Sequence, residues 1–162
     1  MEVFIWIEES FLSTWVREAT WAFPTLLVLH ALGMAFLVGT SLAINCRLLG
    51  LASQMAIQGF IKFYPVMTLA FIVNLVSGLL LLLSYPAKAL TNPVFFLKMA
   101  LVIVAVTLTQ KQKSFIASTP SQSTVAVSTT NKRIAALILF LWAAGIISGR
   151  FLAYTHTWLL VS

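Results

Sequence analysis

The chain has 162 residues, of which 60% are hydrophobic and only 9% are charged, so it lacks the roughly 25% of charged residues that a water-soluble enzyme carries. All four acidic residues are Glu within the first 18 positions, which excludes the paired carboxylates of most hydrolases from the remaining chain. The net charge of +6 comes from Lys and Arg scattered between apolar blocks, and this pattern predicts membrane topology and excludes a nucleic-acid partner.

Residues 3–17 place Phe4, Ile7, Phe11 and Trp15 at helical spacing, with polar residues on another face. This pattern predicts an amphipathic helix that lies in the membrane interface. The alternative is that these residues extend the first membrane-spanning helix.

Four apolar blocks follow, and a bilayer core of about 30 Å is crossed by roughly 20 helical residues. We expect transmembrane helices at about 21–44, 64–84, 94–110 and 134–154. The third block is long enough only if it includes Lys98, whose ammonium can reach the head groups from one turn inside the helix. The predicted fold is all-α: one membrane domain over 1–162, with a four-transmembrane-helix bundle after an N-terminal interfacial helix.

The basic residues in the connections predict the orientation, since cytoplasmic loops are enriched in Lys and Arg. Six of them fall on one side: Arg47, Lys62, Lys111, Lys113, Lys132 and Arg133. The other side has Arg17, Lys88, Lys98 and Arg150, together with every Glu. The first side is therefore expected to be cytoplasmic, and both termini are expected outside. The connection 114–131, where nine of eighteen residues are Ser or Thr, is expected to be a mobile cytoplasmic loop.

Small residues let membrane helices approach closely, and two runs of them predict packing faces. They are the ladder Ala31, Ala35, Gly39 and Ala43 in the first span, and the pair Gly145 and Gly149 in the fourth. We expect both runs to join helices of one bundle. A homodimer face is the alternative for either.

His30, Asn74 and Ser77 are polar residues near the middle of apolar blocks, where side chains usually point into the bundle and find a partner. Helical geometry puts His30 and Asn74 at similar depth. One interpretation is a structural hydrogen bond between them. The other is a haem ligand or a proton-relay group, with His30 as the intramembrane metal candidate.

The depths of the two histidines in the membrane test whether His30 and His156 can hold one haem b between them. In a continuous helix His156 lies about 18 Å above the midplane, and its mismatch with His30 is about 13 Å. This pairing fails unless the chain bends back. Ligation by His30 with Met34 or Met67, or by His30 and its copy across a dimer axis, stays open.

Lys98 and Arg150 fall within the outer leaflet, where a charge is costly unless it is paired or reaches the interface. Together they predict a site for an anionic group, such as a lipid phosphate or haem propionates. Contact with lipid head groups alone is the alternative, and Glu18 is a third candidate, as an ion-pair partner.

Several runs carry a resemblance to a known family: Leu29-His30-Ala31-Leu32-Gly33-Met34-Ala35, Tyr64-Pro65-Val66-Met67, Asn74-Leu75-Val76-Ser77-Gly78, Tyr85-Pro86-Ala87-Lys88 and Gly149-Arg150. The chain resembles a family of small bacterial inner-membrane proteins catalogued as a domain of unknown function. Family members often carry an acidic residue where this chain has Asn45. The resemblance implies the bacterial inner membrane. The outer side, where the basic residues predict both termini, is then the periplasm. The layout is also similar to copper-resistance D proteins and b-type cytochrome membrane subunits.

Three functions remain as hypotheses. The first is a non-catalytic membrane subunit or partner of a periplasmic protein, which uses the outer face around Glu18, Lys98 and Arg150. The second is a b-type haem or copper-handling protein with His30 as ligand. The third is a small-solute or ion transporter with His30 and Asn74 along a polar path.

Overall fold

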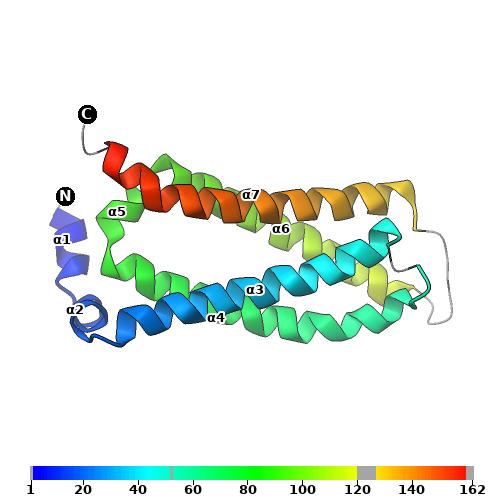
Figure 1. Ribbon diagram of the computed structural model, residues 1–162, viewed down its shortest axis with the longest axis horizontal. Coiled ribbons are helices and arrows are strands. Elements are labelled where there is room, and N and C mark those ends of the chain that lie inside the picture. The colour runs from blue at the N-terminus through cyan, green and yellow to red at the C-terminus, as the bar shows by residue number, and fades with distance from the viewer. Residues whose placement is uncertain (1, 52, 120–126, 160–162) are drawn as a thin grey trace.

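Four long helices form a bundle in the computed structural model, which describes residues 2–51, 53–119 and 127–159. They are α3 (Ala22–Leu49), α4 (Phe63–Ser84), α6 (Pro93–Ser118) and α7 (Thr129–Leu159). Each contains a stretch that is long and apolar enough to cross a membrane. The bundle in Figure 1 therefore confirms the predicted all-α fold class, and the chain is a multi-pass membrane protein.

Short local signals set the ends of the long helices. Asn92 begins α6 by accepting a hydrogen bond from the Val94 amide on its side-chain oxygen, at 2.9 Å, and Pro93 occupies the first turn. Gly50 ends α3 with φ at 105°, in the left-handed region that suits glycine, and its amide bonds to the carbonyl of Arg47 at 3.1 Å.

The segment 3–17, predicted as one interfacial helix, forms two. They are α1 (Glu2–Glu8) and α2 (Phe11–Glu18). The chain breaks at Ser10, which has an extended backbone and accepts a hydrogen bond from the Ser13 amide on its hydroxyl. Arg17 donates to the carbonyl of Glu8 and so ties the two helices together. The alternative, that this segment extends α3, is also wrong, because the chain turns at Ala19.

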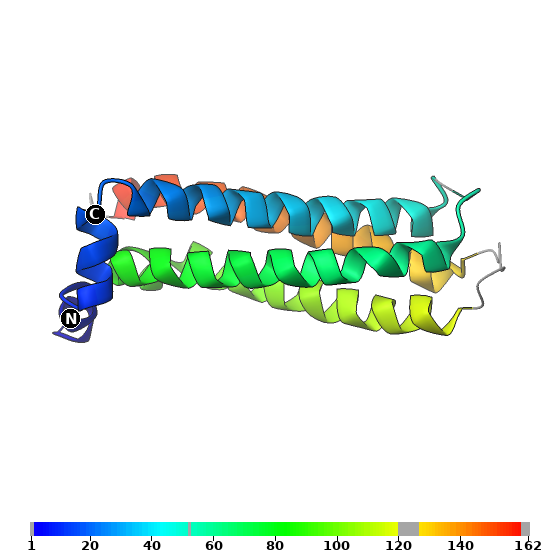
Figure 2. The same ribbon diagram turned by 90° about the horizontal axis from the view of Figure 1, so that it is seen from below.

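Both α1 and α2 lie across one end of the bundle, as Figure 2 shows, with the short helix α5 (Pro86–Leu90) beside them. The last turns of α7 reach this same end, which we call the terminal end. The opposite end holds the short helix η1 (Ile57–Lys62) and most of the Lys and Arg residues. We call it the basic end.

The segment predicted as a loop, 114–131, is helical at both of its edges. Residues up to Ser118 belong to α6, and α7 begins at Thr129. The hydroxyl of Ser118 donates to the carbonyl of Phe115 within the helix, at 2.9 Å, and Ile116 is fully buried. The Ser-rich composition therefore does not end the helix, because these hydroxyls bond to helix carbonyls. Residues 120–126 of this prediction lie outside the described residues.

The bundle consists of two helix pairs, α3 with α4 and α6 with α7, which meet chiefly where α3 contacts α7. The hydrophobic core lies from the middle of the bundle to the basic end. Its largest buried members are Tyr64, Trp142, Phe60, Met67, Ile44, Leu48, Ile116 and Ile138. Toward the terminal end, buried side chains between the long helices are small or polar, such as Ser77, Ser84 and Ser148. This half of the bundle is less completely filled by apolar packing.

Candidate functional site

His30 of α3 meets Asn74 and Ser77 of α4 in the terminal half of the bundle. The Asn74 side-chain amide donates to the main-chain carbonyl of His30 at 2.8 Å. In return, Nδ1 of His30 lies 3.0 Å from the Asn74 carbonyl oxygen and 3.2 Å from the Ser77 hydroxyl. The structure thus brings these three sequence-predicted residues together, and each helix supplies both a donor and an acceptor.

These contacts fix the orientation of the imidazole. The carbonyl of Asn74 can only accept, so Nδ1 of His30 carries the hydrogen. The Ser77 hydroxyl donates to the Val73 carbonyl at 2.7 Å and therefore also accepts from the imidazole. In the neutral ring, Nε2 then keeps its lone pair, which is the arrangement found in many ligating histidines.

Two glycines allow the close approach of α3 and α4 at this point. A Cβ on Gly33 would lie 3.0 Å from the backbone nitrogen of Asn74 and 3.1 Å from the Ala70 carbonyl oxygen. A Cβ on Gly78 would lie 3.0 Å from Cε1 of His30. The imidazole therefore packs directly against Gly78, where an added methyl group would require the ring to shift.

The predicted packing ladder of α3 lies elsewhere. Ala31, Ala35 and Gly39 are exposed on the surface of the bundle, and Ala43 is half-buried. A Cβ on Gly39 would meet nothing within 4 Å. The prediction that the ladder packs within the bundle is therefore not met at Ala31, Ala35 and Gly39, whereas Ala43 packs against the apolar core. Gly33, on a different face, is the residue that allows the close approach of α4. The homodimer alternative stays a prediction.

On α7, the two glycines of the predicted pair have different surroundings. Gly145 is buried, but a Cβ there would meet no atom within 4 Å. At Gly149 the neighbour is the side chain of Lys98 from α6, with Cε at 3.6 Å and Nζ at 3.7 Å from the Cβ position. Gly149 of α7 therefore accommodates a lysine side chain of α6, which is a contact between two helices of the bundle, although through a side chain and not through close backbones.

Lys98 of α6 lies in the same half of the bundle as His30, close enough for an electrostatic interaction with the imidazole, without a hydrogen bond between the two side chains. Lys98 is half-buried and has neither a hydrogen bond nor an ion pair within the described parts of the chain. Glu18 and Arg150 are both exposed, and no ion pair joins Glu18 to either cation. The structure thus places Lys98 in the same half of the bundle as His30, and it does not bring Glu18 into an ion pair with Lys98 or Arg150.

The remaining ligand candidates for a haem or a metal do not gather around His30. Met67 is buried in the core, toward the basic end, and Met34 is packed against that core. The side chain of His156 lies outside the described residues. Across the described ranges, three or more His, Cys, Asp or Glu side chains nowhere come together as a metal site.

A second polar contact between helices, which joins α3 and α6, was not predicted from the sequence. Asn45 of α3 is completely buried, and its side-chain oxygen accepts from the Gln112 amide of α6 at 2.8 Å. The Asn45 amide donates to the Ser41 carbonyl at 2.7 Å. Gln112 stands between Lys111 and Lys113, beyond the end predicted for the third span at residue 110, so it was not considered as a candidate residue. Its helical spacing from Thr109 was the available signal.

Comparison with known protein families, with curated proteins and with solved structures finds no match for this chain. The resemblance to the inner-membrane family of unknown function therefore stays a prediction. The geometry of the site alone carries the functional argument.

Proposed function

We propose that this protein is a non-catalytic membrane subunit that binds the anionic head group of an amphiphile in the terminal half of the bundle. Lys98 supplies the positive charge, and His30 lies in the same half of the bundle. The observation that carries the proposal is the half-buried ammonium of Lys98, which has no ion-pair partner among the described residues.

The charge of Lys98 has no counter-ion within the membrane-spanning part of the chain, because all the acidic residues precede position 19. A cation at membrane depth is costly unless an anion or a polar group compensates it. Phosphate and carboxylate oxygens accept strong, charge-assisted hydrogen bonds from an ammonium group. An anionic ligand therefore supplies the compensation that the described residues do not.

The arrangement of the helices favours a ligand that enters from the bilayer. At the terminal end, α1, α2 and α5 pack over the ends of the spanning helices. Between the two helix pairs, buried side chains in this half are small or polar. A lipid-like molecule can place its head group near Lys98 from the side and keep its chains in the bilayer, whereas a water-soluble anion has to pass the covering helices.

The proposed location is the bacterial inner membrane, with both termini in the periplasm. The concentration of Lys and Arg at the basic end supports this orientation, because cytoplasmic loops are enriched in these residues. The site then lies in the outer leaflet. A periplasmic or membrane-protein partner, or a second copy of the chain, is proposed as the assembly in which the subunit works.

Native mass spectrometry of gently extracted protein tests the proposal. We expect the wild type to retain a bound anionic amphiphile and Lys98→Gln to lose it, with an affinity at least about tenfold lower, because a hydrogen bond to a charged group contributes about 1.5–3 kcal/mol. Lys111→Gln is the matched control, since Lys111 is an exposed lysine of the same helix near the basic end. Equal retention by all three proteins would contradict the proposal and favour simple contact of Lys98 with lipid head groups.

Haem b is a second candidate, and the lone pair on Nε2 of His30 is the observation that favours it. Nε2 fits as an axial ligand and Lys98 fits as the partner of a propionate. The cavity of about 80 Å³ near the core does not fit haem, because His30 is not among the residues that line it. When bound, haem would supply one-electron redox chemistry. A Soret band that His30→Ala abolishes supports this candidate, and a colourless wild type excludes it.

A further inference from the structure

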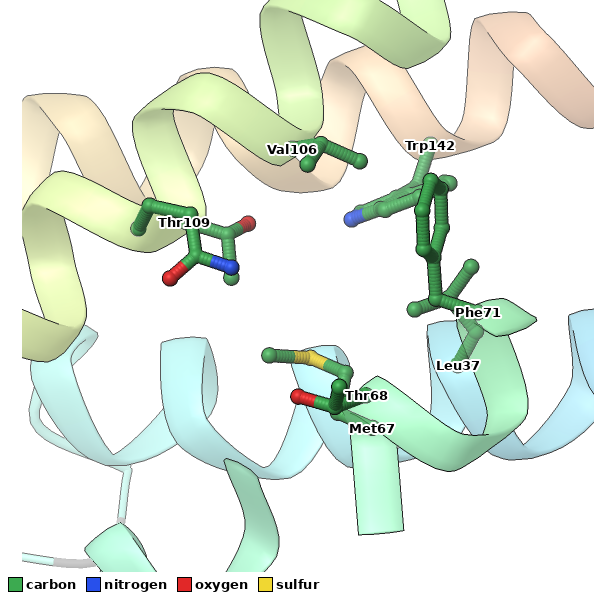
Figure 3. A pocket seen from close by; sticks show the side chains of 8 residues that line it. Leu37, Met67, Thr68, Phe71, Val106, Thr109 and Trp142 are labelled. Carbon is green, nitrogen blue, oxygen red and sulfur yellow. The ribbon is translucent and has the colours of Figure 1, made fainter. Parts of the chain in front are cut away.

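A cavity of about 80 Å³ lies among the four spanning helices, near the core and away from Lys98. It is partly open to the surface of the bundle, where Thr68 and Gln110 of its lining are exposed. Its walls are mainly apolar, as Leu37 of α3, Phe71 of α4 and Val106 of α6 show. Four polar side chains also border it: Thr68, Thr109, Trp142 and the exposed Gln110. Figure 3 shows the indole nitrogen of Trp142 directed into the space between these residues.

The polar groups around this cavity have complementary roles. Thr68 donates its hydroxyl hydrogen to the Tyr64 carbonyl and Thr109 donates to the Ala105 carbonyl, both at 2.8 Å. Each hydroxyl oxygen therefore offers only lone pairs to an occupant. The indole N–H of Trp142 is buried and has no acceptor among the described residues. An occupant that both accepts and donates hydrogen bonds would satisfy all three groups.

Two further buried polar atoms lie next to the cavity residues along α4 and α6, toward the basic end. The Tyr64 hydroxyl and the Gln112 side-chain oxygen have no partner in the described parts of the chain. Tyr64 is one turn from Thr68 on α4, and Gln112 is one turn from Thr109 on α6. Tyr64 is 2% exposed and Gln112 is 6% exposed, so bulk water does not solvate these side chains.

We propose that this cavity is a hydration site, which holds a small cluster of water molecules hydrogen-bonded to Trp142, Thr68 and Thr109. Water both accepts and donates, as the three groups require. A cavity of this volume has room for a few water molecules, and polar lining separates hydrated cavities from dry, apolar ones. The proposal does not depend on ligand binding at Lys98.

Radiolytic hydroxyl-radical footprinting of the whole protein in lipid nanodiscs tests the proposal. Radicals that form from ordered water oxidise the side chains next to it, whereas lipid-facing side chains are shielded from water. We expect Phe71 and Trp142 to be oxidised several times faster than Phe140, which is 66% exposed on the lipid-facing side of α7. Equal rates at these three residues would overturn the proposal, whether the cavity is empty or holds an acyl chain.

Two threonines of α6 give a matched pair of variants. Thr109→Val removes a lone-pair acceptor from the cavity and preserves its shape, so the oxidation rate of Trp142 is expected to fall several-fold. Thr107→Val is the control, because Thr107 is exposed and bonds to its own helix at Ile103. An unchanged Trp142 rate in Thr109→Val would overturn the hydrogen-bonded arrangement. If this variant does not fold, Thr68→Val provides the same test from α4, and the wild-type comparison stands without any variant.

Discussion

Single glycines decide how closely α3 and α4 approach. At Gly33 a methyl group would press on the backbone of α4, 3.0 Å from the Asn74 nitrogen, and a backbone atom cannot move away as a flexible side chain can. We expect Gly33→Ala to destabilise the protein by about 1–3 kcal/mol, as overpacking does. Unfolding in detergent measures this difference.

Gly39→Ala is the internal control for that measurement, because a Cβ at Gly39 meets nothing within 4 Å. Replacing glycine by alanine inside a helix stabilises it by about 0.5–1 kcal/mol when no contact opposes the change. Gly39→Ala should therefore be neutral or slightly stabilising in the monomer. The same loss of stability in both variants would contradict the assigned packing faces.

The hydrogen bonds between His30 and Asn74 can be tested by a single substitution. Asn74→Ala removes the donor to the His30 carbonyl, and interhelical hydrogen bonds in membranes contribute about 0.6–2 kcal/mol. We expect a loss of stability in that range. Thr107→Ala, which removes a hydroxyl that bonds only within its own helix, should lose less. The opposite order of these two variants would count against the pairing.

The sequence could suggest that His30 and Asn74 meet, because both are polar residues at similar depth in apolar helices. It could not show that each side chain bonds to the other residue's main chain, since that depends on the rotation of the helices about their axes. The same limit explains the misplaced ladder. Small residues can face lipid as well as another helix, and Ala31 and Ala35 are exposed where Gly33 is buried.

At the scale of elements, apolar length predicted the number of spanning helices, whereas local composition predicted their ends poorly. The Ser- and Thr-rich stretch after Ile116 continues α6, because hydroxyls can bond to the helix carbonyls. The N-terminal segment divides at Ser10 through a local cap that a periodicity argument does not detect. Helix boundaries therefore depend on single hydrogen bonds more than on composition.

Hydrogen–deuterium exchange tests the end of α6. The amides of residues 115–118 should be protected, because they lie in a helix and Ile116 is fully buried. We expect their exchange to be slower than that of an unstructured chain by at least about tenfold. Exchange at the unstructured rate from Ser114 onward would restore the original prediction of a loop.

At the scale of the molecule, the two helix pairs share their apolar core from the middle of the bundle to the basic end. Their terminal half has small and polar buried groups, and the half-buried Lys98 lies there. The sequence indicated Lys98, His30 and Gly149 as separate candidates. It could not show that Lys98 lies against Gly149 and near His30, because such contacts depend on how the pairs are arranged.

The proposed orientation predicts which end a membrane-impermeant thiol reagent reaches. In a Cys46→Ala background, Thr20→Cys at the terminal end should react in intact spheroplasts. Ser53→Cys at the basic end should react only after permeabilisation. Both positions are exposed, so access to the residue does not differ between them. Labelling of Ser53→Cys alone in intact spheroplasts would reverse the orientation.

The most direct test of the proposed function is the preference of the delipidated protein for an anionic over a zwitterionic phospholipid. Titration with phosphatidylglycerol and with phosphatidylcholine gives this ratio of dissociation constants for the wild type and for Lys98→Gln. We predict that the wild type prefers the anionic lipid about tenfold, which corresponds to about 1.4 kcal/mol, and that Lys98→Gln shows almost no preference. The same preference in both proteins would contradict the role of Lys98.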